Sequence, residues 1–348
     1  MNRITMKMLA DELQLSVATV SKAITDSHEI SNETKLRVNA LVQELNYVPN
    51  HYASSLGRRN SKTIGVIIPE VVDSFFAQAI NGIESVAQEK GYSVLIYLTH
   101  ENYEKEKAIL KDFENGRVDG VLMSVSRETT KADHITRLIN KGVPLIFFDR
   151  VFDGIDATKI TTNDFESAYL ATKHLIINGC KRILFLSFSN SLSISGKRLN
   201  GYKKALLEYK MKVSDKNILN FTNESKSDYI LLKRKLKSAK RVDGILASVE
   251  KLAFPIYQAC EELNLTIPGD VQVISFSNLE TASFLNPPLT TIAQPAFDIG
   301  KTAASILMKA LGRKNFYLQK EDVVIASTMV LRKSTKPPCP PKGGSWTL

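Results

Sequence analysis

Two successive sets of alternating strand and helix patterns constrain the fold of this 348-residue chain more than any other feature. The first set starts at residue 63, with helical patterns at 75–90, 102–116 and 131–141 between the apolar runs TIGVIIP, YSVLIYL, DGVLMSV and VPLIFFD. The second set follows residue 162, with helical patterns near 164–178, 197–210, 225–240 and 251–264 around RILFLSF, DGILASV and VQVISF. A helical pattern at 296–311 and a last strand pattern, VVIASTMVLR, end the series. Repeated β-α-β units predict an α/β fold with two doubly wound parallel sheets.

Composition and missing motifs exclude several classes of protein. Apolar residues make up 43% and charged residues 24%, which fits a globular protein and not a collagen, a coiled coil or a disordered chain. No run of about 18 apolar residues and no signal-peptide core is present, so we expect a cytoplasmic protein without a membrane span. The cysteines and histidines have no metal-site spacing, and the GxGxxG, Walker, GxSxG and HExxH motifs are missing. We therefore expect no metal, no cofactor and no enzyme activity.

The positive charge is concentrated in one segment. The net charge is +10, which makes nucleic acid a candidate partner, but residues 1–62 contribute only +2. Seven basic residues and one acid lie between Lys226 and Arg241. The apolar residues of this segment fit one face of a helix, which indicates a solvated surface helix. A second nucleic-acid contact is the alternative interpretation.

The first 48 residues contain no strand-like run and predict three short helices, capped by Thr5, Ser16 and Ser31. The string ADELQLSVATVSKAI has the layout of a helix-turn-helix, whose second helix enters the major groove of DNA. Val17 and Ala18 would meet thymine methyl groups, and Lys22 would reach guanine or a phosphate. Hydroxyl groups suited to phosphate contacts belong to Ser16, Thr19, Ser21 and Thr25. A small helical domain that binds protein is the alternative.

A short helix is predicted directly after this head. Pro49 ends the third helix, Asn50 is a good N-cap and Gly57 is a good C-terminal stop. A helix of about six residues is not stable alone in water, so it should form only when something packs against it.

Several strings in the chain resemble the lactose-repressor/galactose-repressor family of bacterial transcription regulators. In the head they are TMKMLA, LSVATVSKA, ISNETK and LNYVPNHYASSL; in the core they include VDGVL, PLIFFDR, KRLNGY and PPLTTIAQP. The resemblance extends to about Ser334 and implies a two-lobed core like a periplasmic sugar-binding protein, with three crossovers between the lobes. It also implies a homodimer on a pseudo-palindromic operator in double-stranded DNA, at the bacterial nucleoid. The tail lacks the leucine heptads of a tetramer.

This resemblance implies five segments. They are the head at 1–48, the hinge helix and linker at 49–62, an N-terminal lobe at 63–161 plus 293–322, a C-terminal lobe at 162–292 plus 323–334, and a disordered tail at 335–348. In the family, paired hinge helices sit in the minor groove, and Leu56 has the position of the apolar wedge that opens a base step. The implied DNA contacts are Thr5, Ser16, Val17, Ala18, Thr19, Ser21, Lys22, Thr25, Ser31, Tyr47, Asn50, His51, Ala53 and Leu56. Gln14 stands where the family often has glycine, so a positive φ would be mildly strained there.

The resemblance and the sheet topology together imply an effector site between the lobes, at the carboxyl ends of the strands. The implied contacts are Phe75, Phe76, Asp149, Arg198, Ser277, Asn278 and Gln294. The two phenylalanines could equally belong to the core, and Asp149 could pair with Arg150. Asn163 at the first crossover could line the cleft or tie the linker.

The chain departs from the family on the far side of this cleft. Ser277 and Asn278 replace two acids, and Val249-Glu250 replaces Asn-Asp. We therefore expect the acids that hold sugar hydroxyls to be missing, and a sugar, a sugar phosphate, an acid or no effector all remain open. The function predicted is a DNA-binding repressor of carbohydrate-related genes, controlled by a small molecule. A sugar-binding transport protein would need an export signal and no helix-turn-helix, and an enzyme is a third alternative.

Overall fold

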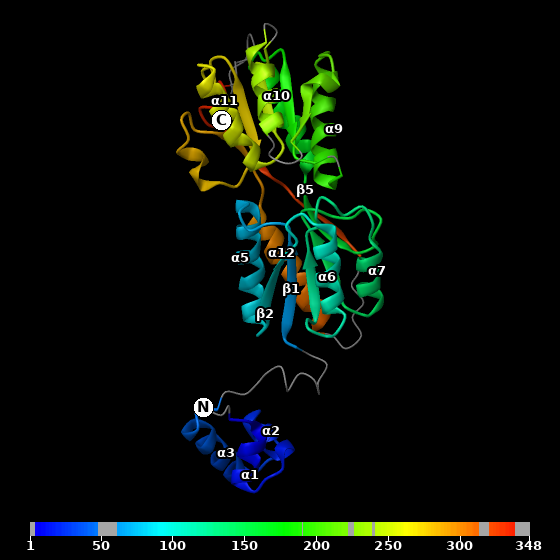
Figure 1. Cartoon of the computed structure of the whole chain (residues 1–348), viewed down its shortest axis with the longest axis vertical. Helices are drawn as coiled ribbons and strands as arrows, with labels where there is room; N and C mark the ends of the chain where they lie inside the picture. The colour runs from blue at the N-terminus through cyan, green and yellow to red at the C-terminus, as the bar shows by residue number, and fades with distance from the viewer. Residues whose placement is uncertain are drawn as a thin grey trace, which may run out of the picture. The chain divides into compact units, whose positions relative to one another are not determined.

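A computed structural model describes residues 4–47, 61–189, 191–221, 226–238, 241–312 and 320–337. The chain divides into two compact units, residues 1–61 and residues 62–348, and each is described by itself (Figure 1). The hinge positions Asn50, His51, Ala53 and Leu56 lie outside the described residues. Among the described residues, no helix combines the length and the apolar character that a bilayer span requires.

The head is a three-helix unit formed by α1 (Met6–Leu13), α2 (Val17–Ile24) and α3 (Asn32–Glu44). The predicted caps are confirmed, because the hydroxyl oxygens of Thr5, Ser16 and Ser31 each accept a hydrogen bond from a backbone N–H in the first turn that follows. The small core consists of Leu9, Ala10, Val20, Ala23 and Val38. Such a core fixes the angle between α1 and α2, which determines how α2 is presented.

Gln14 ends α1 in the left-handed region, with φ 55° and ψ 41°. The turn therefore forms without glycine, as expected. A non-glycine residue in this region costs about 1 kcal/mol, which the packing of the head must offset.

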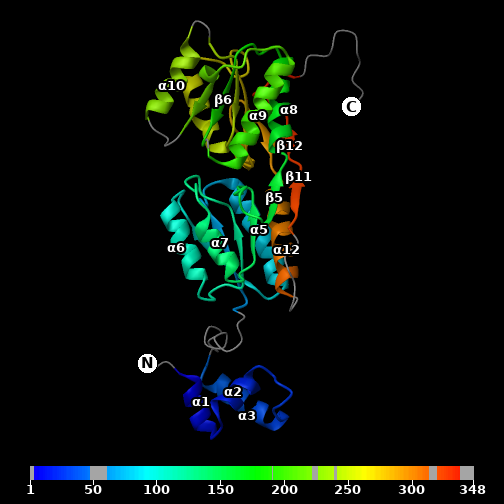
Figure 2. The ribbon, with the colours of Figure 1, turned by 90° about the vertical axis from the view of Figure 1, so that its right-hand side faces the viewer.

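The N-terminal lobe contains a six-stranded sheet with the order β11-β5-β4-β3-β1-β2, and every neighbouring pair is parallel. The strands are β1 (Thr63–Ile68), β2 (Ser93–Leu98), β3 (Gly120–Met123), β4 (Leu145–Phe148), β5 (Thr158–Thr162) and β11 (Asp322–Ile325). One face packs on α5 (Ser74–Glu89) and α12 (Ala296–Leu311), and the other on α6 (Tyr103–Phe113) and α7 (Asp133–Asn140). Figure 2 shows α5 and α12 side by side.

The C-terminal lobe repeats this plan with the strand order β12-β10-β9-β8-β6-β7. Its strands are β6 (Ile183–Ser187), β7 (Ile218–Asn220), β8 (Gly244–Ala247), β9 (Gln272–Phe276), β10 (Thr290–Ala293) and β12 (Thr328–Val330), and only the β10–β12 pair is antiparallel. The faces are covered by α8 (Asp164–Ile177) and α9 (Ser193–Glu208), and by α10 (Lys226–Lys237) and α11 (Ala253–Glu262). Short 3-10 turns lie at Asp215–Asn217, Glu250–Leu252 and Glu280–Ser283.

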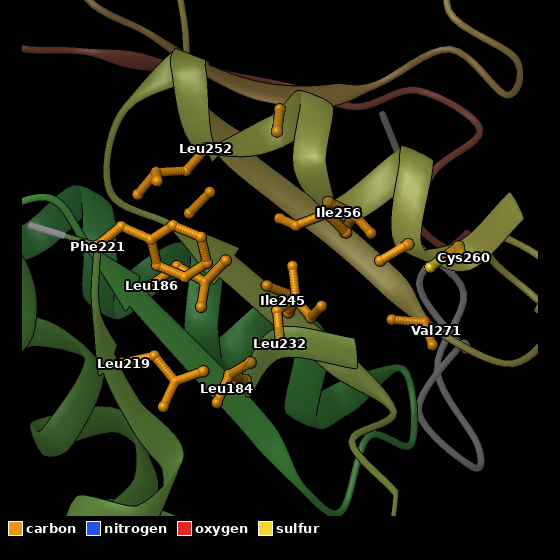
Figure 3. Close-up of a cluster of buried hydrophobic side chains, with 14 of the residues drawn as sticks. Leu184, Leu186, Leu219, Phe221, Leu232, Ile245, Leu252, Ile256, Cys260 and Val271 are labelled. Carbon is orange, nitrogen blue, oxygen red and sulfur yellow. The ribbon is translucent and has the colours of Figure 1, made fainter. Parts of the chain in front are cut away.

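The core under α10 and α11 explains why the basic segment forms a helix. Leu232 and Leu236 of α10 are buried against Leu219 and Ile245 of the sheet (Figure 3). The charged residues of α10 lie on the remaining faces, so the helix is amphipathic and lies on the surface of the lobe, as predicted.

The chain passes between the lobes after β5, after β10 and after β11. Asn163 ties two of these crossovers together, because its Oδ1 accepts hydrogen bonds from the Ser327 N–H (2.8 Å) and the Ser167 hydroxyl (3.0 Å). Of its two expected roles, Asn163 thus has the linker role. Asn163 thereby links the segment that follows β5 to the segment that follows β11, where the lobes meet.

Two predicted boundaries are wrong by a few residues. Asp322–Ile325 pairs with β5, so the last crossover follows residue 325 and not residue 322, and VVIASTMVLR forms two strands instead of one. The hydrogen-bonded structure also extends past residue 334, since the His174 ring contacts the Thr335 hydroxyl (3.2 Å) and Asn178 donates to the Lys336 carbonyl (2.7 Å). Residues 335 and 336 therefore do not belong to a disordered tail.

Candidate functional site

The N-terminal half of α2 presents the surface that the sequence predicts for base contact. Val17 is 44% exposed, and Ala18 and Lys22 are also exposed, whereas Val20 and Ala23 of the same helix are buried. An exposed valine and alanine at a helix start have no packing role in the head. They are therefore available to a partner surface such as the thymine methyl groups of a major groove.

The hydroxyl groups of the head are already used to shape the helices. The Ser16 hydroxyl accepts from the Thr19 N–H (3.0 Å) and bonds the Thr19 hydroxyl (2.8 Å), and the Thr25 hydroxyl donates to the Ser21 carbonyl (3.1 Å). Lys22 forms an exposed ion pair with Glu29. Because an exposed pair contributes only about 0–1 kcal/mol, Lys22 can exchange Glu29 for a phosphate at little cost. Tyr47 packs on the head core.

A cleft with about 330 Å³ of space not filled by atoms lies between the two lobes. The predicted effector residues that line it are Phe75, Asp149, Arg198, Ser277, Asn278 and Gln294. Phe76 does not line it. That ring is 1% exposed and packs edge-on against Phe75 and Phe148, at centroid distances of 5.4 and 6.3 Å. Phe76 therefore belongs to the core, as one of its two expected roles allowed.

Arg198 of α9 is held in one orientation inside the C-terminal lobe. Its Nε donates to Asp164 Oδ1 (2.7 Å), its Nη1 donates to the backbone carbonyl of Ser248 (2.5 Å), and its guanidinium carbon lies 3.9 Å from the centroid of the Phe276 ring. The side chain is almost fully buried. Its Nη2 has no hydrogen-bond partner among the described residues. A fixed donor that lacks a partner is a group that a ligand in this cleft can satisfy.

Asp149 follows β4 in the left-handed region, with φ 59°. Its carboxylate lies 3.8 Å from Arg150 Nε, but the better partner of Arg150 is Glu101, which accepts from Nη1 at 2.8 Å. Burial raises the pKa of Asp149 to about 7, against the opposing charges of Arg150 and Arg198. The expected alternative, a structural Asp149–Arg150 pair, is thus present, but it is the longer of the two ion pairs of Arg150.

Asp73 is a lining residue that the sequence analysis missed. It caps α5, where its Oδ1 accepts from the Phe75 N–H (3.0 Å). Burial, followed by the charge of Glu250, raises its pKa to about 6. An aspartate directly before SFFA is typical of a helix N-cap. This signal could have placed Asp73 at a helix start beside the phenylalanines, but it could not have placed Asp73 inside a cleft.

Glu250 places an acid on the far side of the cleft, where the acids that hold sugar hydroxyls are expected to be missing. It lines the cleft, and its carboxylate accepts from the Ser277 hydroxyl (3.2 Å) and the Asn278 N–H (3.2 Å). The Asn278 side chain donates to Gln78 Oε1 (2.9 Å) in the other lobe. Ser277 and Asn278 therefore lie where predicted, but both are bonded to protein groups.

Gln294 lies at the second crossover. Its backbone N–H donates to Asn278 Oδ1 (2.9 Å), whereas its Nε2 is buried without a partner among the described residues. The lining residues thus include three N–H groups without a hydrogen-bond partner among the described residues, on Arg198 and Gln294 of the C-terminal lobe and at Nε of Arg150 in the N-terminal lobe, beside the acids Asp73 and Asp149. This arrangement can bind a compact molecule that both donates and accepts hydrogen bonds.

Residues 5–50 match the family model described as "Bacterial regulatory proteins, lacI family", and residues 61–333 match "Periplasmic binding proteins and sugar binding domain of LacI family". The chain belongs to the lacI family. The helix-turn-helix prediction and the predicted fold class are confirmed, and the protein is a DNA-binding transcriptional regulator of the LacI type.

Individual relatives agree with this assignment. The ribose operon repressor of Haemophilus influenzae is 32% identical over 95% of this chain and 98% of its own length. The crystal structure of a LacI family transcriptional regulator from Enterococcus faecium with bound ribose is 28% identical, with a TM-score of 0.69 over 79% of this chain and 99% of its own. The lac repressor dimer bound to operator shares the fold, with a TM-score of 0.81 at 24% identity over 96% and 99% of the two chains.

Proposed function

We propose that this protein represses carbohydrate-related genes and that a small polyol bound between the lobes controls it. The observation that carries the proposal is the lining of the cleft. It combines the N–H groups of Arg198 Nη2 and Gln294 Nε2, which lack partners among the described residues, with the acids Asp73 and Asp149. Sugar hydroxyl groups donate to carboxylates and accept from N–H groups, so they satisfy both sides. Phe75 supplies an apolar surface for the carbon face of a ring.

The relatives favour a monosaccharide as the effector. The relative named as a ribose repressor and the neighbour solved with ribose support a pentose or similar sugar. The effector groups come from both lobes, so a ligand that contacts both shifts the equilibrium between open and closed cores.

We infer that DNA binding involves a homodimer on a pseudo-palindromic operator, with one α2 per half-site and the hinge segment in the minor groove. The exposed Val17, Ala18 and Lys22 support the first part, and the string at 45–56 supports the second. The protein would act in the cytoplasm at the bacterial nucleoid, as a regulator and not as an enzyme.

A thermal-shift titration with neutral pentoses and hexoses tests the effector proposal. A sugar that binds only the folded protein raises the melting temperature with concentration. The Asp149→Asn variant should lose most of this rise, because it replaces a carboxyl oxygen with an N–H group that cannot accept a hydrogen bond, while Asp112→Asn on the exposed side of α6 should keep it. A full panel without any shift, or an equal shift in both variants, would contradict the proposal.

A further inference from the structure

The Glu250 carboxylate joins the two lobes at the cleft. Glu250 follows β8 in the C-terminal lobe, and Ser74 is the first residue of α5 in the N-terminal lobe. Glu250 Oε1 accepts from the Ser74 N–H at 2.8 Å, and Oε2 accepts from the Ser74 hydroxyl at 2.5 Å. An acid of one lobe thus occupies the N-terminus of a helix in the other, where unpaired N–H groups and the helix dipole favour negative charge.

Two donors of the C-terminal lobe complete the surroundings of this carboxylate. The Ser277 hydroxyl and the Asn278 N–H both donate to Oε2, at 3.2 Å. Four donors therefore converge on one side chain that is 7% exposed. Hydrogen bonds to an ionised acceptor are stronger than neutral ones, so this carboxylate is firmly held.

The remaining charges of the cleft also disfavour an anion. Three acids line it, namely Asp73, Asp149 and Glu250. The two lining arginines are already paired, Arg150 with Glu101 and Arg198 with Asp164. Each arginine is thus offset by its partner acid, and Glu250 adds a further carboxylate. A phosphate or carboxylate brought into the cleft would meet no unpaired arginine, and the repulsion grows above the raised pKa values of Asp73 and Asp149.

We propose that Glu250 determines the charge of the effector, so that the cleft takes a polyol without a phosphate or carboxylate group. This inference rests on the proposed effector function of the cleft. Glu250 already accepts hydrogen bonds from the Ser74, Ser277 and Asn278 donors that an anion would need. Arg198 Nη2 and Gln294 Nε2, which belong to lining residues, have no hydrogen-bond partner among the described residues. Those two N–H groups suit neutral hydroxyl oxygens.

Inorganic phosphate is the probe that tests this role, with no sugar present. Thermal unfolding of the full-length protein is followed while phosphate replaces chloride at constant ionic strength. The natural protein should show no phosphate-specific stabilisation. The Glu250→Ala variant frees four donors and removes one negative charge, so its apparent phosphate affinity should be at least about tenfold higher, a difference of about 1.4 kcal/mol. Glu261→Ala, an exposed acid of the same lobe, should behave like the natural protein.

A folded Glu250→Ala protein that gains no phosphate binding overturns the proposal, and so does a natural protein that binds phosphate as tightly as the variant. Glu250→Gln keeps the length of the side chain and an acceptor for Ser74, so it provides the same comparison with a smaller gain if the alanine protein does not fold. Failure of every neutral sugar to bind would reject the effector function but would leave this result unchanged, because phosphate alone is the probe.

Discussion

The two lobes share one architecture but contribute different chemistry to the cleft between them. Each has a six-stranded sheet and a close pair of helices, α5 with α12 in one lobe and α8 with α9 in the other. Each also places an arginine over a phenylalanine ring and beside a buried acid. The N-terminal lobe, however, supplies both acids with raised pKa values, Asp73 and Asp149, whereas the C-terminal lobe supplies two of the three lining N–H groups without a hydrogen-bond partner among the described residues. The repeated scaffold thus fixes positions, and a few residues at the strand ends decide what is bound.

The substitutions with the largest expected effect on stability lie where the helices of each close pair meet. A Cβ added at Gly82 would lie 2.1 Å from the Phe297 carbonyl oxygen, and one at Gly201 would lie 2.1 Å from the Phe165 carbonyl oxygen. Gly82→Ala and Gly201→Ala should each lower the free energy of unfolding by roughly 3 kcal/mol, because the backbones must move apart. Urea denaturation measures this loss.

A third glycine gives the matched control for this pair. Gly196 of α9 has open space around its added Cβ, so Gly196→Ala should raise the free energy of unfolding, by about 1 kcal/mol, through helix propensity. If alanine is tolerated at only one of Gly82 and Gly201, the helix pairs of the two lobes are not equivalent in packing.

The two arginines should differ in a way that sharpens the comparison. Asp164, the partner of Arg198, is 1% exposed and has an Oδ2 without a partner among the described residues. Glu101, the partner of Arg150, also accepts from the Arg127 N–H at 2.8 Å. Arg198→Met should therefore cost about 3 kcal/mol of folding free energy and Arg150→Met about half of that. Equal losses in denaturant unfolding would show that the second donor to Glu101 does not matter.

The raised pKa of Asp149 predicts a pH dependence of stability. The value rises from 3.8 to about 7 on folding, first because of burial. Between these pH values the unfolded chain is ionised while the folded chain keeps its proton, so this group makes the folded state less stable as the pH increases. Asp149→Asn removes the effect and should be more stable than the natural protein at pH 8, by about 1–3 kcal/mol, with the difference vanishing near pH 4.

Thermal unfolding across this pH range, with Asp112→Asn as the exposed control, checks the sign. The pKa of Asp73, raised to about 6, predicts the same direction over a narrower range. A difference that grows towards pH 4 would show that Asp149 is ionised and stabilising in the folded protein.

Local signals predicted most of the elements, because caps and apolar periodicity act within a few residues. The cap at Ser16 and the parallel strands β1, β3 and β4 were predicted in this way. Strands β7 and β10 were not, since short runs of three or four residues carry too little pattern. The partnership of Glu250 with Ser74, 176 residues apart in the chain, has no local signal at all. The sequence offered Glu250 only as a departure from the family, and its hydrogen bonds emerge when the lobes meet.

The smallest expected effect concerns the basic helix α10 of the C-terminal lobe. No described helix of the N-terminal lobe carries a similar excess of positive charge. Lys226 is exposed at its first turn, and we expect Lys226→Ala to leave operator affinity and its salt dependence unchanged. Lys22→Ala in the head should weaken binding, with a change of about 1 in the salt slope if it contacts a phosphate. Leu56→Ala should also weaken binding more than Lys226→Ala does, if the hinge wedges into DNA. Fluorescence anisotropy with an operator fragment selected by the purified protein measures all three. A loss for Lys226 as large as that for Lys22 would assign α10 a nucleic-acid contact, and the lobes would then differ in their outer surfaces as well as in the cleft.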